Sequence, residues 1–334
     1  MSTAVGTLVE DSLHIAREAL KQFDFSPRAT LDVVSLSGKV TFRIEDPATN
    51  ERAALRLHRA DQHDVPQIKS ELLWLDALAQ ARCVDVAPPI ATIDGDRVAR
   101  VDTLDGERLV TVTGWLDGEP ADASGDLSPA FELLGAATAR LHDHAERWTL
   151  PPGFCRRQWN AERLLGQRPA LGSWRDGAGL GPEERALLEA TELALRRDLA
   201  TFPAGPGDYG LIHADLRLAN VLLGRKDGRE VVRIIDFDDC GPGWFMYDFG
   251  AAVSFMEDDP RVDALAGAWA VGYRTVRGLS AAAEAQLPTF VMLRRLTLVG
   301  WAAEHHDTAP DAAALGSNFT AGACELAERY LSGR

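Results

Sequence analysis

One stretch of the chain, residues 211–250, constrains the fold more than any other part of the sequence. An apolar run leads into His213 and Asp215, and Asn220 follows five residues after that aspartate. A second apolar run ends at Asp236. Short apolar runs bounded by polar residues are typical of buried strands. We therefore expect two short strands here, one followed by a loop that carries Asp215 and one that ends at Asp236.

The order of these side chains suits the transfer of a phosphoryl group from a metal-bound nucleotide. A single carboxylate, that of Asp215, can act as general base or orient the acceptor hydroxyl. Asn220 and Asp236 offer oxygen ligands, which Mg²⁺ accepts beside phosphate oxygens. An isolated HxD pattern has little specificity, whereas HxDxxxxN followed by a hairpin-like sequence and a strand-ending aspartate is specific. We predict Asp215 as the catalytic residue, and Asn220 and Asp236 as the metal ligands.

Length and composition limit the class of protein. The 334 residues suit two packed lobes, and 46% hydrophobic with 25% charged residues is ordinary globular usage. The net charge is −15 and no Lys/Arg block stands out, so nucleic acid and anionic membranes are poor candidate partners. The acidity fits a cationic small substrate, and it fits a role in solubility at least as well.

Cysteine usage and hydropathy indicate the compartment. The four cysteines (Cys83, Cys155, Cys240 and Cys324) are scattered and form no CxxC pair, which argues against structural zinc and against a disulfide scaffold. The N-terminal residues lack a basic start and a sustained apolar segment. No run of about 20 apolar residues occurs that could span a bilayer. We expect a cytoplasmic protein with reduced thiols.

The first third of the chain is rich in predicted strands. A short amphipathic helix near residues 8–23 precedes three strands within residues 30–57. A helix is predicted over residues 67–81, where apolar residues recur on one face. Two more strands are predicted within residues 90–116, around an Asp-Gly turn. This part is therefore β-rich with one main helix.

The rest of the chain is mainly helical by its pattern. Long helices are predicted over residues 130–148 and 182–200, with an irregular Gly- and Arg-rich segment between them. Residues 211–239 supply short strands, and helical periodicity then continues to the C-terminal region. We predict an α+β chain with a nucleotide-covering lobe at 1–114 and a larger catalytic and acceptor-binding lobe at 115–334.

The motifs resemble the aminoglycoside phosphotransferase and choline kinase-like family, whose members are similar in architecture to protein kinases. The family pattern is H-G-D with Asn five residues later, then I-D-F/W with acidic residues, then Y-D-L/F. It stands in this chain as His213-Ala214-Asp215, Asn220, Ile235-Asp236-Phe237-Asp238-Asp239 and Tyr247-Asp248-Phe249. The resemblance extends over residues 25–305. It implies a two-lobe protein-kinase-like fold, with a small antiparallel sheet in the first lobe, and ATP and Mg²⁺ as cofactors.

The resemblance also implies phosphate-binding residues in the first lobe. Ser37 and Gly38 stand at the turn that covers the phosphates with backbone N–H groups in the family. Arg56 stands where the family has a phosphate-binding lysine, and its planar fork can still pair with phosphates. Glu71, fifteen residues later, fits the glutamate that pairs with that cation. Lys69 lies near enough in sequence to compete for this assignment.

Three further residues complete the predicted nucleotide site. Thr113 and Trp115 lie in the segment that looks like the interlobe hinge, where the adenine is expected to make backbone hydrogen bonds in the cleft. Leu222 begins a strand that is expected to lie beneath the nucleotide.

Other polar side chains near the motifs have simpler interpretations. His213 is expected to hydrogen-bond the backbone of its own loop, and Asp248 to anchor the catalytic loop rather than touch substrate. The acids at 238–239 suit a second metal or a cationic acceptor, and equally suit a turn. Arg294 and Arg295 lie on an apolar helix, where we expect them at its surface or beside neutralising acids.

The acceptor is less well determined than the reaction. The segment between Asp236 and Asp248 is short and has no A-P-E-like sequence for docking a peptide. We therefore predict transfer of the γ-phosphoryl group to the hydroxyl of a small molecule, such as an aminoglycoside, an amino alcohol or a homoserine-like compound. Alternatives are a Ser/Thr kinase acting on a protein or peptide, and a nucleotide-binding pseudokinase scaffold, which Arg56 in place of lysine keeps open. The sequence does not determine the oligomeric state.

Overall fold

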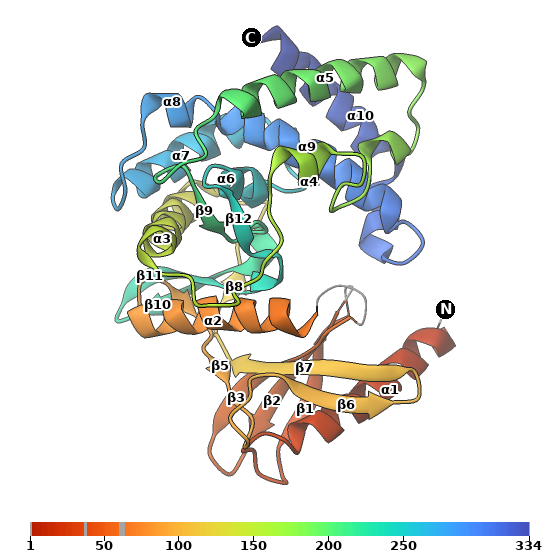
Figure 1. Ribbon diagram of the computed structural model, residues 1–334, viewed down its shortest axis with the longest axis vertical. Coiled ribbons are helices and arrows are strands. Elements are labelled where there is room, and N and C mark those ends of the chain that lie inside the picture. Colours follow the sequence, from red (N-terminus) through yellow and green to blue (C-terminus); the bar gives the residue numbers. More distant parts are fainter. Residues whose placement is uncertain (1, 37–38, 60–63, 334) are drawn as a thin grey trace. The chain divides into compact units, whose positions relative to one another are not determined.

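The computed structural model describes residues 2–36, 39–59 and 64–333 (Figure 1). The chain divides into two compact units. Unit 1 extends to Asp117 and includes Leu150–Cys155, whereas unit 2 comprises Gly118–Thr149 and the residues from Arg156 onward. The sequence-based division after residue 114 falls just before this break.

Unit 1 combines an antiparallel sheet with two long helices. The strands follow the order β1-β2-β3-β7-β5, and β6 pairs with the other part of β7. The bounds are α1 (Ser2–Leu20), β1 (Thr30–Ser35), β2 (Val40–Asp46), β3 (Glu51–Leu57), α2 (Val65–Ala81), β4 (Asp85–Val86), β5 (Pro89–Ile90), β6 (Ala99–Thr103) and β7 (Gly106–Gly114). Helix α2 begins where Asp64 accepts a 2.9 Å hydrogen bond from the Gln67 N–H, because an N-cap carboxylate satisfies a free backbone donor of the first turn.

The core of unit 1 lies between α1 and the sheet. Strand β2 alternates buried and partly exposed residues, so Phe42 and Ile44 face the same side. They pack in one apolar cluster with Leu55 of β3 and with Ala16 and Ala19 of α1. Successive residues of a strand point to opposite faces of the sheet, so Arg56 lies on the face opposite to Leu55 and the apolar cluster.

Unit 2 is mainly helical and contains short strands around the sequence motifs. Strand β12 pairs antiparallel with β9, and β10 pairs antiparallel with both β11 and β8. The helices are α3 (Ser128–Arg147), α4 (Ala161–Leu165), α5 (Pro182–Thr201), α6 (Tyr247–Ala252), α7 (Val262–Arg274), α8 (Ala281–Glu284), α9 (Leu287–Glu304) and α10 (Pro310–Ser332). The strands are β8 (Glu119–Pro120), β9 (Tyr209–Ile212), β10 (Val221–Lys226), β11 (Arg229–Ile234) and β12 (Gly241–Trp244). Short 3₁₀ turns are η1 (Trp174–Asp176), η2 (Leu218–Asn220) and η3 (Phe237–Asp239).

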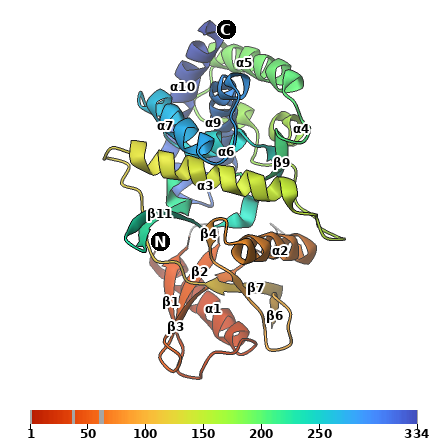
Figure 2. The same ribbon diagram turned by 90° about the vertical axis from the view of Figure 1, so that its left-hand side faces the viewer.

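Two close helix contacts organise unit 2. Helices α3 and α7 cross with their backbones in contact, and a Cβ on Gly272 would meet the Glu132 carbonyl oxygen at 1.8 Å. Helix α9 packs against α5, α6 and α10 (Figures 1 and 2). Its residues 289–300 are all buried. A helix that is buried all round has no solvent face, which matters for the charged residues on α9.

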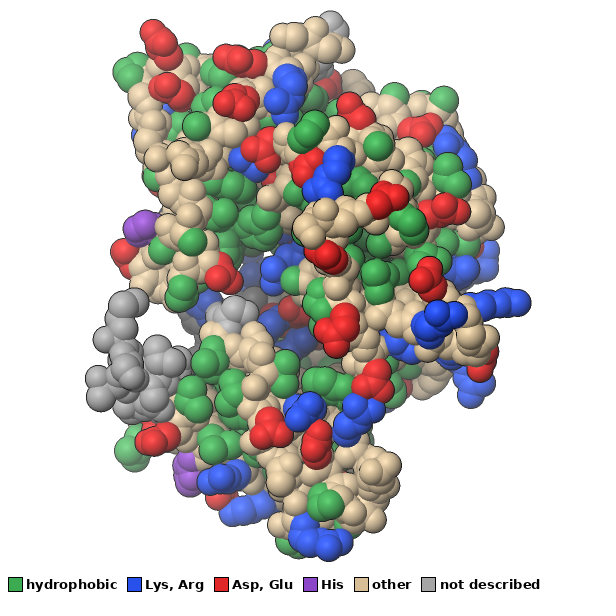
Figure 3. Space-filling model, turned by 180° about the vertical axis from the view of Figure 1, so that it is seen from behind, with side chains coloured by type: hydrophobic (Ala, Val, Ile, Leu, Met, Phe, Trp, Pro, Cys, Tyr) green, Lys and Arg blue, Asp and Glu red, His purple; other side chains and the backbone are tan. Residues whose placement is uncertain are grey.

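The fold class predicted from the sequence is confirmed. An antiparallel sheet occupies the N-terminal part, and helices dominate the C-terminal part. Among the helices of the described residues, none is long and apolar enough to cross a membrane. On the face shown in Figure 3, acidic and basic side chains are interspersed over the surface.

Candidate active site

The loop after β9, residues 213–217, carries Asp215 and is the predicted catalytic loop. Its side chain is 16% exposed, so it is reachable from solvent although its partners are buried. Oδ2 accepts a 2.8 Å hydrogen bond from Asn220 Nδ2, and Oδ1 accepts one of 2.6 Å from Arg294. The structure thus places a fixed carboxylate at the end of a strand, as the spacing predicted.

Asn220 is held so that its amide nitrogen faces the catalytic loop. Nδ2 donates to the Asp215 backbone oxygen and to Asp215 Oδ2, both at 2.8 Å. Turn η2 ends at Asn220 and brings it back towards Asp215. An amide has two N–H donors and one carbonyl acceptor. Because Asp215 takes the donors, the Asn220 carbonyl oxygen is the atom that suits a cation.

Asp236 lies two residues after the end of β11, next to the same loop. The Ile235 N–H donates to the backbone carbonyl of Asn220 at 3.1 Å, and His213 Nε2 donates to the backbone carbonyl of Ile235 at 3.0 Å. Asp236 itself has φ = 67° and ψ = 65°. A non-glycine residue in the left-handed region is strained, and such strain persists where the surroundings over-determine it, often at functional sites. Asp215, Asn220 and Asp236 are therefore brought together in unit 2.

These residues fit a magnesium site. No group of three or more His, Cys, Asp or Glu side chains suited to a metal occurs among the described residues. Mg²⁺ needs less than that, since it is commonly bound by one or two carboxylates while phosphates and water supply the other oxygens. One carboxylate and one amide oxygen match this requirement.

Asp248 is the anchor of the catalytic loop. It is completely buried in α6 and accepts hydrogen bonds from the backbone N–H groups of His213 (3.1 Å) and Ala214 (2.7 Å). Ala214 has φ = 68°, a conformation that glycine adopts without steric cost. The family's usual glycine is therefore replaced here by a strained alanine, which the two bonds to Asp248 hold in place.

A buried chain of hydrogen bonds continues behind Asp248. His142 of α3 donates from Nε2 to Asp248 at 3.0 Å, and its Nδ1 lies 2.9 Å from the Tyr273 hydroxyl. Burial lowers the pKa of His142, and Asp248 opposes this shift without cancelling it. The imidazole is therefore neutral near pH 7, with Nδ1 accepting from Tyr273. His142 was not predicted from the sequence. The only signal for its burial was its position four residues after Thr138, on the same face of the predicted helix.

His213 has the structural role expected of it. Burial lowers its pKa, while Asp248, Asp215 and Asp236 act in the opposite direction. Nε2 donates to the Ile235 carbonyl, so Nδ1 accepts the Asp215 N–H at 3.2 Å. Both ring nitrogens are used within the loop, and the imidazole carries no proton to a reactant.

Of the two alternatives expected for Arg294 and Arg295, a place at the helix surface is wrong, and a place beside neutralising acids is found. Their side chains are 4% and 2% exposed, because α9 runs through the interior of unit 2. Buried guanidinium groups need carboxylate partners. Arg295 pairs with Glu257 at 2.9 Å and Arg294 with Asp215 at 2.6 Å, so the expected neutralisation by acids is found. Burial alone would lower the pKa of Arg294, but Tyr247 and Asp215 outweigh it and raise that pKa.

The loop after Asp236 is held through its backbone. The Asp239 carbonyl accepts a 2.6 Å hydrogen bond from Trp159 Nε1, and the Cys240 carbonyl accepts one of 2.7 Å from Arg156. Asp238 is buried, and its carbonyl also accepts from Arg156. Segment 156–159 therefore fixes the course of this loop.

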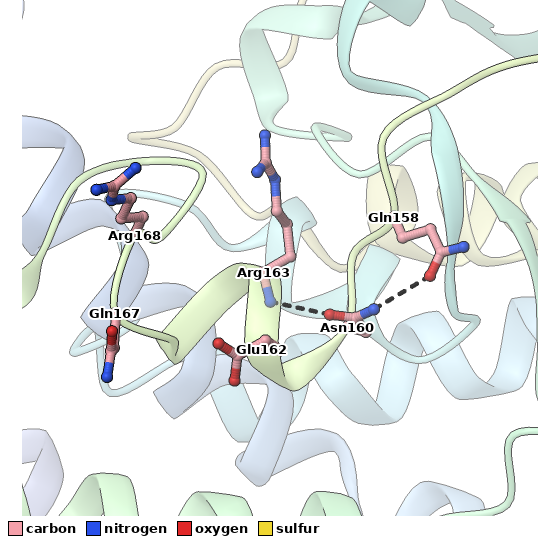
Figure 4. Close-up of a pocket in the computed structure, with 6 residues that line it drawn as sticks. All are labelled: Gln158, Asn160, Glu162, Arg163, Gln167 and Arg168. Atoms are coloured by element: carbon pink, nitrogen blue, oxygen red, sulfur yellow. Dashed lines mark hydrogen bonds between the residues drawn. The ribbon is translucent and has the colours of Figure 1, made fainter.

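A polar cavity of about 510 Å³ lies beside that segment (Figure 4). Arg163 and Glu162 extend from α4, and Arg168 extends from the loop after it. Asn160 accepts from the Arg163 N–H at 2.9 Å and donates to Gln158 at 3.1 Å. The cavity is completed by a sixth residue, Gln167. Charges of both signs line it.

In unit 1, Arg56 and Glu71 form an ion pair. Arg56 NH1 of β3 lies 3.0 Å from Glu71 Oε1 of α2, with side chains 19% and 4% exposed. The competing Lys69 pairs instead with Asp96 at 2.7 Å. Arg56 is therefore the cation that Glu71 holds.

Of the other predicted nucleotide residues, the structure describes Thr113, Trp115 and Leu222. Ser37 and Gly38 lie outside the described residues. Thr113 belongs to β7, opposite Ala54 of β3. The N–H groups of Gly114 and Trp115 already donate to Pro88 (2.9 Å) and Arg52 (3.2 Å), so a nucleotide base would need other backbone groups of this segment. In unit 2, Leu222 lies on β10 and is 9% exposed.

Comparison with known proteins identifies the family. A family model described as "Phosphotransferase enzyme family" matches residues 36–284. The chain belongs to this family. Its enzyme class, a phosphotransferase with an alcohol group as acceptor, is thereby confirmed, as is the resemblance on which it was predicted.

Among solved structures, the phosphotransferase resembles a microcompartment-associated aminopropanol kinase with 43% identity and a TM-score of 0.87, covering 96% of this chain and 98% of the other. An amicoumacin kinase, hAmiN, in complex with AMP-PNP, Ca²⁺ and Ami has the same fold at 21% identity, with a TM-score of 0.77 over 97% and 96% of the two chains. A homoserine kinase of Neisseria meningitidis serogroup B is 32% identical over 211 residues, which is 62% of each protein.

Proposed function

We propose that this phosphotransferase uses ATP and Mg²⁺ to phosphorylate the hydroxyl group of a small amino alcohol or a related amino-substituted acceptor. The observation that carries the proposal is the arrangement of Asp215, Asn220 and Asp236 on one loop system. Asp215 is oriented by two partners, and a backbone hydrogen bond from Ile235 to Asn220 brings the segment that carries Asp236 next to Asn220.

Each residue then has a separate task. Asp215 accepts a hydrogen bond from the acceptor hydroxyl and aligns it for in-line attack on the γ-phosphoryl group. Asn220 and Asp236 hold Mg²⁺, which when bound neutralises charge on the phosphates. Arg56, held by Glu71, pairs with the phosphates of the nucleotide.

A small acceptor is favoured over a protein. The chain between Asp236 and Asp248 is taken up by η3 and by β12, which pairs with β9. This short connection leaves no extended segment on which a peptide could lie. An aminopropanol kinase and a homoserine kinase are also among the relatives.

The acceptor class can be tested with a panel. The purified protein would be incubated with γ-labelled ATP and Mg²⁺ together with an aminopropanol, choline, homoserine, an aminoglycoside or a generic protein substrate. We expect label in the phosphate ester of an amino-substituted small alcohol and none in protein. Label in the protein substrate alone would overturn the proposal in favour of a protein kinase. If the protein neither transferred phosphate nor hydrolysed ATP, that result would favour a silent scaffold.

The metal assignment predicts the behaviour of Asp236→Asn. Loss of an anionic ligand should raise the Mg²⁺ concentration needed for half-maximal activity and reduce kcat by about 10³-fold, since such a metal supplies several kcal/mol of transition-state stabilisation. Initial rates would be measured across a Mg²⁺ series.

Asp227→Asn is the matched control for this experiment. Asp227 is exposed in the turn between β10 and β11 and has φ = 51°, which asparagine tolerates well. An Asp236→Asn enzyme with the Mg²⁺ dependence of the control would contradict the assignment.

A further inference from the structure

Arg294 is a buried cation whose partners lie on the catalytic loop. Charged residues are almost never fully buried unless they are paired. The adjacent Arg295 is explained by packing, because it bonds Glu257 (2.9 Å) and the Phe319 carbonyl (2.8 Å), away from the catalytic loop. The two neighbours on α9 therefore serve different parts of the molecule.

All three guanidinium nitrogens of Arg294 are engaged. NH2 donates to Asp215 Oδ1 at 2.6 Å, and Nε donates to Ser254 Oγ at 2.8 Å. NH1 lies 3.3 Å from the Ala214 carbonyl and 3.4 Å from the Tyr247 hydroxyl. The planar fork thus joins the catalytic loop to α6 and to Ser254, two residues after the end of α6. Its orientation is set independently of Asp215 by the contacts to Ser254 and Tyr247.

The carboxylate of Asp215 is consequently held from two sides. Asn220 donates to Oδ2 at 2.8 Å, and Arg217 Nε lies 3.4 Å from the same oxygen. Arg294 holds Oδ1, so rotation of the carboxylate would break contacts at both oxygens. Each oxygen can accept more than one hydrogen bond, which leaves capacity for a hydroxyl.

We propose that Arg294 is a positioning residue that fixes the Asp215 carboxylate for the acceptor hydroxyl. This inference rests on the proposed role of Asp215. The fork shape matters as well as the charge, because lysine is a point charge that cannot contact Asp215, Ser254 and Ala214 together. A misplacement of about 1 Å in a reacting group costs about 10²-fold in rate.

The test compares Arg294→Lys with Arg295→Lys. Both replace a buried, ion-paired arginine on the same helix, and both will lower thermal stability. At a temperature where both are folded by circular dichroism, Arg294→Lys should lose 10- to 100-fold in kcat with little change in the KM for ATP, as a rough expectation from misplacement of the carboxylate. Arg295→Lys should keep most of its kcat. Equal loss of kcat in the two variants, or wild-type kcat in Arg294→Lys, would overturn the positioning role.

A double variant separates this inference from the proposed function. If Arg294 acts through Asp215, then Asp215→Asn and Asp215→Asn/Arg294→Lys should have the same residual kcat. A further loss in the double variant would show that Arg294 acts elsewhere. An active Asp215→Asn enzyme would instead overturn the proposed function of Asp215, and the positioning role with it. An inactive Asp215→Asn beside a fully active Arg294→Lys would overturn the positioning role alone.

Discussion

Replacement of Asp215 by alanine should abolish phosphoryl transfer for practical purposes, with a loss of about 10²- to 10⁴-fold or more in kcat. In the proposed mechanism Asp215 supplies the carboxylate that the acceptor hydroxyl needs. Arg294 has no acceptor, and the Asn220 amide nitrogen, which faces Asp215, has none either. The affinity for ATP should stay close to that of the wild type, because the proposed nucleotide contacts are made by other residues. Transfer would be measured with labelled ATP, and binding by calorimetry.

The choice of substitution matters for this experiment. Alanine leaves the buried Arg294 without its carboxylate, which costs stability. Asp215→Asn keeps an oxygen for Arg294 and removes the negative charge, so it separates the chemical effect from the effect on folding. Both variants should be inactive at a temperature where each is folded. Wild-type transfer by either one would remove Asp215 from the mechanism.

The second large effect is expected on the free energy of unfolding. Asp248→Ala removes the acceptor for the backbone N–H groups of His213 and Ala214 and for His142 Nε2, all in a completely buried environment. A buried donor left without its partner costs about 1–3 kcal/mol. The free energy of unfolding should therefore fall by about 3 kcal/mol or more, as measured by denaturant titration.

Activity should fall together with stability in Asp248→Ala. Ala214 is held at a positive φ by its bond to Asp248, and without this bond the loop can relax and carry Asp215 away from its place. Asp248→Asn should be intermediate, because its amide still offers one acceptor oxygen. The exposed Asp227→Asn, at a positive φ that asparagine tolerates, serves as a control with a change within about 0.5 kcal/mol. An Asp248→Ala protein as stable as this control would show that the loop is anchored by other contacts.

Several features of the site followed from the sequence because they depend on local geometry. Asn220 lies five residues after Asp215, and the 3₁₀ turn η2 closes that short interval so that the two side chains meet. Asp236 lies near them because β10 and β11 form a hairpin whose register pairs Val221 with Ile234. The fold class followed from the change between strand and helix periodicity along the chain.

The residues that sequence reasoning missed or misplaced depend on distant contacts. His142 and Asp248 are 106 positions apart, and Arg294 and Asp215 are 79 positions apart. Two arginines on an apolar helix are normally expected to reach solvent, because an unpaired buried charge is costly. That expectation reverses only when other segments bring carboxylates to the helix, which no pattern within residues 287–304 reveals.

The sequence by itself therefore indicated the reaction type and the order of the secondary structure, and it predicted which carboxylate is catalytic, since motif spacing and periodicity act over a few residues. Tertiary structure alone decided how that carboxylate is held. Asp248 fixes the loop through its backbone, and Arg294 fixes the Asp215 side chain from a helix far along the chain. The physical reason is that burial makes each of these polar groups depend on a partner, and only the packing of α3, α6 and α9 in unit 2 supplies the partners.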